Sequence, residues 1–380
     1  MLDVLTPMDD YPIHQTAFPV AHVASGDPNH YDRYFYNGYR GDASLFFGAA
    51  MGLYPNRQVI DASFSVIVDG VQHNVYASGR CPLDRSRTSV GPITIEIVEP
   101  LRINRLIVDA PDQGLRAELT WSARTQAIEE PVQTKRNANL LVLEYTRLAQ
   151  WGSWAGWIEI EGRRIEVDRS DTLGTKDKSW GIRPIGAATP GAPNAGWFAG
   201  GGLFWLWAPV HWDDECTHLG VFEHSDGRRW FESASRIPIL AEGDPVWGQP
   251  ERVTEVARFD RVIEWKPGTR RAQAARFTYW PHGDGEPEML TFEPLLDFQM
   301  KGIGYTHPTW GHGNWHGELA VGADSWRLAD LDPIDPSNIH VQALCRVTGN
   351  RGRQGIGVLE QLVFGPHEPT GLTGIIDGYA

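Results

Sequence analysis

The aspartate at position 177 is the first candidate for acid–base chemistry in this sequence. It lies in the run Thr-Lys-Asp-Lys-Ser-Trp-Gly, and on an extended strand its side chain shares a face with Ser179 while the flanking lysines point the other way. Desolvation in a water-poor cavity would raise the pKa of Asp177 toward neutrality, so that it could act as a general acid or base. A purely structural role for Asp177 is equally open.

Trp180 and Arg183 follow shortly after this aspartate and have two interpretations. They could contact a substrate that lies next to the carboxyl group. Alternatively, the guanidinium could stack on the indole and close one end of a β-barrel, which is the interpretation we favour.

A second segment, residues 304–318, holds three His, two Trp and four Gly in fifteen positions. If residues 311–319 form a strand, its alternation places a row of polar side chains on one face: His312, Asn314, His316 and Glu318. Trp315 would then pack on the other face. Such a row beside small residues favours a polar patch over a ligand cavity, and structural hydrogen bonding is the alternative.

The same row raises the question of a metal site, because His312, His316 and Glu318 are all plausible ligands. However, the chain has no HExxH-type spacing, and neighbouring residues on one face of a strand lie ~7 Å apart, too far to converge comfortably on one ion. We therefore predict no metal site here.

A third segment, residues 30–39, carries four tyrosines, and a fifth, Tyr54, follows nearby. On a strand Tyr34 and Tyr36 face together, with Asp32 on their side and Arg33 opposite. A tyrosine-lined wall near a carboxylate could bind or protonate a substrate, and core packing with hydroxyls at the rim is the alternative.

Familiar catalytic devices are missing from the sequence. It has no GxGxxG after a strand, no P-loop, no GxSxG elbow and no CxxC pair. A nucleotide cofactor or a serine-hydrolase mechanism is therefore not expected, and we predict chemistry without any cofactor.

Composition narrows the classes of partner. With 34 basic and 48 acidic residues the formal net charge is −14, and such a surface repels nucleic acid and anionic lipid. No stretch approaches the ~18 to 20 apolar residues of a membrane span, and the N-terminus lacks the apolar core of a signal peptide. The three cysteines are widely separated and odd in number, so we expect a reducing, cytoplasmic location.

The elements that must position these residues read as short strands separated by turn signals. Asp69-Gly70 and Glu161-Gly162 each join two alternating segments and predict hairpins, as does Gly322-Ala323-Asp324 between 316–321 and 325–329. Residues 140–150 fit a strand or a helix equally well. No other segment predicts an amphipathic helix.

A chain of 380 residues fits two domains of about 190 residues each. The Gly- and Pro-rich stretch 186–202 is the best candidate for a linker, between an N-terminal domain at 1–185 and a C-terminal domain at 203–380. Each half offers enough strands for one closed barrel, and a barrel of about eight strands can hold one small ligand. We predict an all-β fold of two tandem lipocalin-like antiparallel β-barrels.

Four runs in this chain resemble a known superfamily: Asp-Lys-Ser-Trp-Gly (177–181), Tyr-Asp-Arg-Tyr-Phe (31–35), Gly-Tyr-Thr-His-Pro-Thr-Trp-Gly-His-Gly (304–313) and Leu-Glu-Gln-Leu-Val-Phe-Gly-Pro (359–366). The superfamily is that of carotenoid 1,2-hydratase (hydroxyneurosporene synthase) and AttH-like proteins, and the chain is most similar to a bacterial branch of no assigned activity. The resemblance implies two lipocalin-like barrels, a greasy substrate and no cofactor. It does not imply one reaction.

The resemblance also bears on individual positions. Asp177 matches the aspartate of the superfamily's Asp-x-x-Trp-Gly signature, and Trp180 matches its tryptophan. Where relatives often carry His or Arg after the aspartate, this chain has Lys178, which keeps the charge but loses imidazole chemistry. If that histidine shuttles protons in relatives, another group must do so here, and His312 is our candidate.

We therefore expect an enzyme that transfers protons, a hydro-lyase acting on a hydrophobic isoprenoid- or steroid-like small molecule. Asp177 would protonate an alkene, aromatic faces would stabilise the cation, and His312 or Tyr305 would deliver water. The residues expected to contact the substrate are Tyr34, Tyr36, Trp180, Arg183, Trp310 and His316. A Diels–Alderase-like cyclase or isomerase and a non-catalytic carrier of a lipophilic ligand are the alternatives, and the sequence leaves the oligomeric state open.

Overall fold

The fold consists of β-strands joined by turns and short 3-10 helices. The computed structural model describes residues 5–13, 17–19, 21–137, 139–186 and 202–379, and within these ranges no α-helix occurs. The 3-10 helices are η1 Pro7–Asp10, η2 Pro55–Arg57, η3 Pro111–Gln113, η4 Pro250–Arg252, η5 Met300–Ile303, η6 Leu328–Asp330, η7 Asn350–Gly352 and η8 Glu368–Thr370. The predicted all-β class is confirmed. In the described residues no helix has the length and apolar character that crossing a membrane requires.

The chain divides into two compact units that do not follow a single cut in the sequence. Unit 1 comprises Met1–Ala192, Leu240–Gln249 and Gly302–Trp326, and unit 2 comprises the rest. Two segments from the second half of the chain therefore belong to unit 1. The predicted linker lies, except for its two end residues, outside the described residues.

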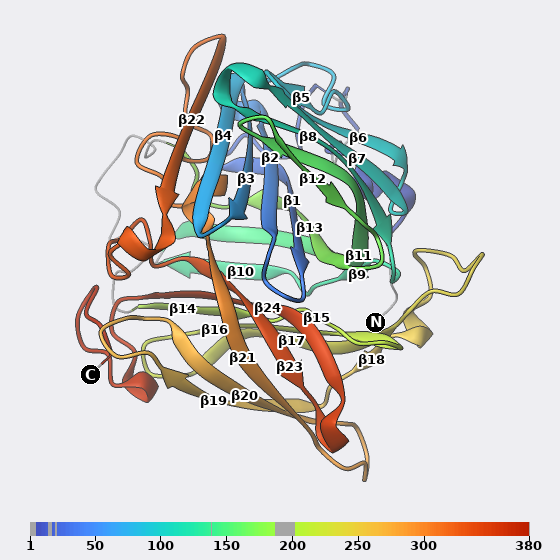
Figure 1. The fold of residues 1–380 in the computed structure, drawn as a ribbon, viewed down its shortest axis with the longest axis vertical. Coiled ribbons are helices and arrows are strands. Elements are labelled where there is room, and N and C mark those ends of the chain that lie inside the picture. Colours follow the sequence, from blue (N-terminus) through green and yellow to red (C-terminus); the bar gives the residue numbers. More distant parts are fainter. Residues whose placement is uncertain (1–4, 14–16, 20, 138, 187–201, 380) are drawn as a thin grey trace. The chain divides into compact units, whose positions relative to one another are not determined.

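Unit 1 is built on one large antiparallel sheet (Figure 1). Its strands are β1 His30–Arg40, β2 Phe46–Tyr54, β3 Val59–Val68, β4 Val71–Arg80, β5 Ser89–Val90, β6 Ile93–Glu99, β7 Ile103–Ala110, β8 Leu115–Ala123, β9 Ile128–Glu129, β10 Gln133–Asn137, β11 Leu140–Ile160, β12 Arg163–Val167, β13 Thr172–Ile182 and β22 Leu319–Arg327. The order in the sheet is β22-β4-β3-β2-β1-β13-β11-β8-β7-β6-β5, with β9, β10 and β12 paired to β11. The segment 140–150 is thus part of a long strand.

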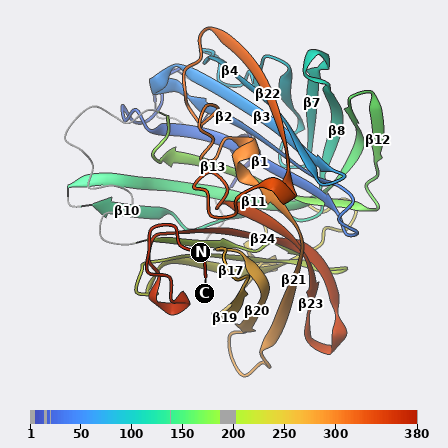
Figure 2. The ribbon, with the colours of Figure 1, turned by 60° about the vertical axis from the view of Figure 1, so that its left-hand side comes forward.

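The sheet of unit 1 curls around its own core, because β5 contacts β3 and β4, and β6 contacts β3, although these strands lie toward opposite ends of the strand order. Figure 2 shows that the strands of this sheet do not lie in one plane. The core contains aromatic rings from several strands, among them Tyr36, Phe47, Trp121 and Trp154. Tyr36 meets Trp121 and Trp154 edge to face at 5.9 and 5.6 Å between ring centroids. These rings fill the space that a packed interior requires.

The pairing of β1 with β13 decides which polar side chains reach this core. Tyr34 lies opposite Lys178 and Tyr36 opposite Lys176, so these four side chains share the core-facing side of the sheet. Both ammonium groups are fully buried and paired, Lys178 with Asp32 at 2.6 Å and Lys176 with Asp10 of η1. Burial without such partners would cost several kcal/mol for each charge.

Unit 2 is built on a second antiparallel sheet with its own core, which includes Phe204, Phe277 and Phe292. The order in this sheet is β18-β17-β16-β14-β24-β23-β21-β20-β19, with β15 paired to β16 and β24. Its strands are β14 Leu203–Trp207, β15 Val210–His211, β16 Glu215–Glu223, β17 Arg229–Pro238, β18 Thr254–Glu255, β19 Arg258–Trp265, β20 Ala272–Trp280, β21 Glu288–Gln299, β23 Val341–Thr348 and β24 Gln354–Phe364.

Hairpin predictions succeeded where the turn chemistry is strong. Asp69-Gly70 joins β3 to β4 and Glu161-Gly162 joins β11 to β12, and all four residues have the positive φ of a tight hairpin turn. Two predictions between 311 and 329 were wrong. Residues 311–318 form a loop, and the predicted hairpin at 322–324 is the middle of the continuous strand β22. Glycines at 313 and 317 with φ of +70° and +111° bend the chain before β22 begins.

Candidate functional site

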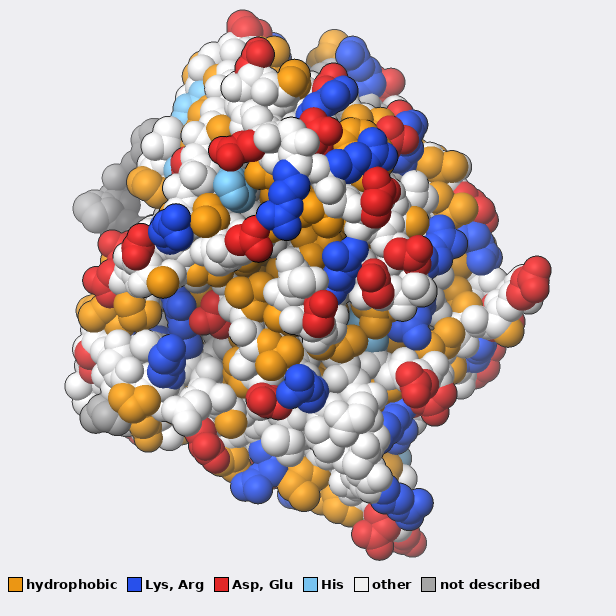
Figure 3. Space-filling view, viewed as in Figure 1, with side chains coloured by type: hydrophobic (Ala, Val, Ile, Leu, Met, Phe, Trp, Pro, Cys, Tyr) orange, Lys and Arg blue, Asp and Glu red, His pale blue; other side chains and the backbone are white. Residues whose placement is uncertain are grey.

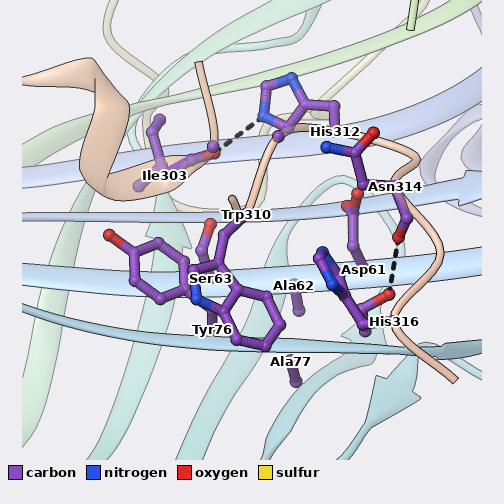
Figure 4. A pocket seen from close by; sticks show the side chains of 13 residues that line it. Asp61, Ala62, Ser63, Tyr76, Ala77, Ile303, Trp310, His312, Asn314 and His316 are labelled. Carbon is purple, nitrogen blue, oxygen red and sulfur yellow. Dashed lines mark hydrogen bonds between the residues drawn. The ribbon is translucent and has the colours of Figure 1, made fainter. Parts of the chain in front are cut away.

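A pocket in unit 1 lies between the loop 303–316 and the neighbouring strands β3 and β4 (Figure 4). The space between these side chains amounts to about 250 Å³ and includes open solvent, and its enclosed part is about the size of one water molecule. The lining residues are Asp61, Ala62, Ser63, Tyr76, Ala77, Ser78, Ile303, Gly304, Trp310, Gly311, His312, Asn314 and His316. The pocket therefore combines a carboxyl group, two imidazoles, hydroxyls and aromatic faces, which is the mixture expected of a small-molecule site.

Asp61 is the acidic group of this pocket and lies near the start of β3. One carboxylate oxygen accepts a hydrogen bond of 2.6 Å from the backbone N–H of Gly313, and the other accepts one of 3.1 Å from the Tyr54 hydroxyl. Burial raises the pKa of Asp61 from 3.8 to about 6, against the opposing effects of the Gly313 hydrogen bond and the Arg33 charge. A carboxyl group that titrates near neutrality can both give and take a proton at physiological pH.

His312 lines the pocket with both ring nitrogens engaged. Its Nε2 is 2.8 Å from the carbonyl oxygen of Ile303, which can only accept, so Nε2 carries the hydrogen. Its Nδ1 is 3.3 Å from Nη1 of Arg33, which can only donate, so Nδ1 carries none. The imidazole is therefore held in one neutral tautomer. A ring held in this way fixes the position of the loop.

Gly304 makes this contact sterically feasible. Its φ is +94°, and a Cβ built on it would lie 2.6 Å from Cδ2 of His312. Any side chain at this position would displace the imidazole from the Ile303 carbonyl.

The aromatic wall of the pocket is made by Trp310 and Tyr76, whose rings stack at 5.6 Å with an angle of 3° between their planes. Asp324 on β22 accepts hydrogen bonds from the Tyr76 hydroxyl at 3.0 Å and from Nε2 of His307 at 3.1 Å. The Nδ1 atom of His307 in turn accepts the backbone N–H of Trp310 at 2.8 Å. This chain of contacts holds the indole in place.

His316 also lines the pocket, as the sequence predicted for a residue that contacts a substrate. Its ring lies 4.6 Å from that of Trp310, and its Nε2 atom is buried without a hydrogen-bond partner in the described part of the chain. Figure 4 shows it on the same side of β3 and β4 as Asp61 and Trp310. A buried polar atom without a partner is costly unless a ligand or water satisfies it.

Tyr305 lies next to the pocket without lining it. Its ring meets that of His312 edge to face at 4.6 Å, and the guanidinium of Arg33 lies 4.4 Å from its centroid. Arg183 also faces it, at 5.7 Å, and lies closer to Tyr31, at 4.7 Å. The guanidinium of Arg183 therefore contacts tyrosine rings, while Nζ of Lys178 lies 5.0 Å from the Trp180 ring; the stack of Arg183 on Trp180 stays a prediction.

Asp177 does not line this pocket. It lies on the face of the sheet away from Lys176 and Lys178, as the strand alternation predicts, and its carboxylate forms an ion pair of 3.0 Å with Nη1 of Arg147. Arg147 also approaches Glu130 at 3.3 Å. Asp177 is thus engaged in an ion pair away from the pocket, and an acid role for it stays a prediction.

Tyr34 and Tyr36, predicted to contact a substrate, are fully buried in the core of unit 1. Their rings stack at 6.4 Å, and their hydroxyls are occupied by the Asp10 carbonyl at 2.6 Å and by Asn104 at 3.1 Å. Both residues therefore pack in the core, which was the alternative to substrate contact.

The row of polar residues predicted at 312–318 does not form, because this segment is a loop. Glu318 instead pairs with Arg80 on the surface, where its side chain is 72% exposed. Within the described ranges no group of three His, Cys, Asp or Glu side chains is arranged to hold a metal ion.

Asp61 is the functional candidate that the sequence analysis missed. The available signal was a single carboxylate inside the otherwise apolar and hydroxylated strand Val-Ile-Asp-Ala-Ser-Phe-Ser-Val-Ile-Val, which forms the buried β3. A charge in such a strand needs an explanation, by pairing or by function.

The surface carries mixed charge. On the face shown in Figure 3, acidic and basic side chains alternate, and neither gathers into one large patch. This face offers no basic track of the kind that binds a phosphate backbone.

Comparison with known proteins places the chain by its fold. A family model described as "Family of unknown function (DUF8625)" matches residues 5–373. A search of the curated proteins finds no match.

Solved structures share the architecture at low sequence identity. An AttH protein from Nitrosomonas europaea is 14% identical, with 94% of this chain and 98% of that chain covered and a TM-score of 0.50. Kievitone hydratase from Nectria haematococca is 11% identical, with 93% and 97% covered and a TM-score of 0.51. CghA is 11% identical, with 95% and 97% covered and a TM-score of 0.48. The first two matches confirm the expected similarity in fold to an AttH protein and to a hydratase.

Proposed function

The chain belongs to this family of unknown function, DUF8625, and from the pocket of unit 1 we propose that it is a proton-transfer enzyme of the hydratase or dehydratase type, acting on a hydrophobic small molecule. The observation that carries the proposal is the position of Asp61. It is a partly buried carboxyl group whose pKa is raised to about 6. It lines the same pocket as the stacked rings of Trp310 and Tyr76.

In hydration, the protonated Asp61 gives its proton to one carbon of an alkene, and the π bond breaks as the new C–H bond forms. A water molecule then adds to the cationic carbon, and the Asp61 carboxylate takes the proton that the water loses. Run backwards, the same steps remove water from an alcohol. With a pKa near 6, about one tenth of Asp61 is protonated at pH 7, so both protonation states are available.

The aromatic faces serve the cationic intermediate. Each contact between a cation and an indole or phenol face contributes about 1 to 2 kcal/mol once water is excluded. His316, through its unpaired Nε2, is suited to hold the attacking water or the product hydroxyl.

The fold match is compatible with this proposal, because one protein of similar fold is named a hydratase. An isoprenoid- or steroid-like substrate remains our proposal from the aromatic lining.

The test is a product analysis in heavy-oxygen water. The full chain is incubated with panels of isoprenoids, steroids and polyketides, and products are followed by mass spectrometry. Label in the product that disappears with Asp61→Asn supports the proposal. A rearranged product without label would favour a cyclase, and tight binding of an unchanged molecule would favour a carrier; either result overturns hydration.

A further inference from the structure

Two guanidinium groups beside the pocket, those of Arg33 and Arg183, have no carboxylate at ion-pair distance within the described residues. Arg33 is only 2% exposed, and its Nε atom has no hydrogen-bond partner within the described residues. Its remaining contacts are to His312 at 3.3 Å and to the carbonyl oxygen of Ile303 at 3.5 Å, and neither is an anion. Arg183 is half-buried and contacts the rings of Tyr31 and Tyr305.

Other buried cations of unit 1 provide the comparison. Three of them are matched to carboxylates, Lys176 with Asp10, Lys178 with Asp32, and Arg147 with Asp177. A fourth, Arg85, donates to the carbonyl oxygen of Pro12. In the part of the chain that the structure describes, neither Arg33 nor Arg183 has an acidic side chain at ion-pair distance. A buried charge without a counter-ion is expensive, so two adjacent cases at one site point to a ligand.

Tyr305 occupies the position that a counter-ion would take. Its ring lies 4.4 Å from the Arg33 guanidinium and 5.7 Å from that of Arg183. Tyr305 lies in a loop, and the residues on either side of it, Gly304 and Thr306, have φ of +94° and +55°. A cation–π contact stabilises a guanidinium far less than a bidentate bond to a planar oxyanion does, so a ligand oxyanion could displace the ring.

We propose that Arg33 and Arg183 form the binding site for a planar oxyanion of the substrate, a carboxylate or enolate, in the position now covered by the Tyr305 ring. This inference rests on the proposed function and narrows its substrate class to an amphipathic acid, with its apolar part toward Trp310 and Tyr76. Arg33 contacts His312, which lines the pocket, so the oxyanion would lie next to the reacting group.

The experiment compares two probes that differ only in charge, decanoate and decanamide. Calorimetric titration of the full chain at pH 7.5 is expected to show decanoate bound at least tenfold more tightly than decanamide. Arg183→Gln should remove this preference. Arg80→Gln is the matched control, because Arg80 also stacks on an aromatic ring, Trp315 at 4.8 Å, but is exposed and paired with Glu318.

Equal affinity for the two probes would overturn the inference, as would an equal loss of preference in the Arg80 control. Arg33→Gln adds a readout that does not depend on ligand affinity. Since the Arg33 charge lowers the pKa of Asp61, its removal should shift the pH dependence of turnover to higher pH. A folded Arg33 variant that keeps the preference for decanoate would count against the inference.

The binding assay also separates this inference from the proposed function, because it needs no turnover. Loss of charge discrimination would leave proton transfer by Asp61 untouched. Conversely, an Asp61→Asn protein that retains both turnover and the decanoate preference would overturn the proposed function and leave the oxyanion site standing.

Discussion

Asp61 and Gly313 are joined by a hydrogen bond of 2.6 Å although 252 positions separate them in the chain. The bond attaches the loop 303–316 to β3 and at the same time brings the carboxylate into the pocket. The group proposed to move protons is thus also an anchor of the loop that encloses it. Its protonation state therefore affects both the chemistry and the geometry of the site.

Replacement of Asp61 by Asn should reduce turnover by at least about 100-fold, because the amide cannot transfer a proton yet can still accept the Gly313 hydrogen bond. Asp177→Asn is the comparison, since Asp177 was the acid predicted from sequence and pairs with Arg147. We expect the Asp177 variant to lose much less activity. The measurement is the initial rate of label incorporation from heavy-oxygen water into the product. The reverse order would return the acid role to Asp177.

Stability should depend on pH through Asp61. Its pKa is raised from 3.8 to about 6, so the folded protein binds the proton more tightly than the unfolded chain does. This contribution is fully present below about pH 4 and is lost as the pH rises through 6, by up to about 3 kcal/mol. Urea unfolding between pH 4 and 7.5 should show the loss in the wild type and not in Asp61→Asn; parallel curves would contradict the burial of this carboxyl group.

His312 should behave as a positioning residue. Because Ile303 and Arg33 hold its neutral tautomer, His312→Gln is expected to lower kcat about tenfold without moving the pH at which activity changes. A pH–rate profile of this variant is the measurement. Disappearance of one limb of the profile would show instead that the imidazole carries a proton.

The buried pair Lys178–Asp32 should be a large contributor to the integrity of unit 1. Lys178→Met leaves the Asp32 carboxylate buried without its ammonium partner, and such losses cost about 3–5 kcal/mol. Arg163→Met is the control, because the Arg163–Asp69 pair is 63% and 74% exposed and should contribute less than about 1 kcal/mol. The measurement is the free energy of unfolding of the two variants in denaturant. A similar loss of stability in both would refute the prediction.

Local patterns succeeded where the backbone alone sets the geometry. Alternation along β1 and β13 placed Tyr34 and Tyr36 with Asp32 on one face, and Arg33 on the other, because successive side chains of any strand point to opposite sides. Asp69-Gly70 likewise predicted a hairpin correctly, since few residue pairs adopt the positive φ of such a turn. These are properties of a few neighbouring residues.

The candidate site could be read only in part. The richness of 304–318 in His and Trp was visible, and Trp310, His312 and His316 do line the pocket. Their arrangement was not predictable, because the loop takes its shape from distant partners such as Arg33 and Asp61. Distance in sequence also concealed the role of Asp61: one partner, Tyr54, ends the preceding strand β2, but the other, Gly313, comes from this loop.

The amino-acid order by itself determined an all-β chain, the faces of its strands and the segments dense in chemistry, because these follow from short-range sterics and side-chain periodicity. Only the tertiary structure decided which carboxyl group meets the aromatic pocket and which is neutralised. Asp61 is desolvated beside Trp310, whereas Asp177 is held by Arg147. Desolvation and charge pairing depend on what surrounds a group in space, and those neighbours come from strands and loops far apart in the chain.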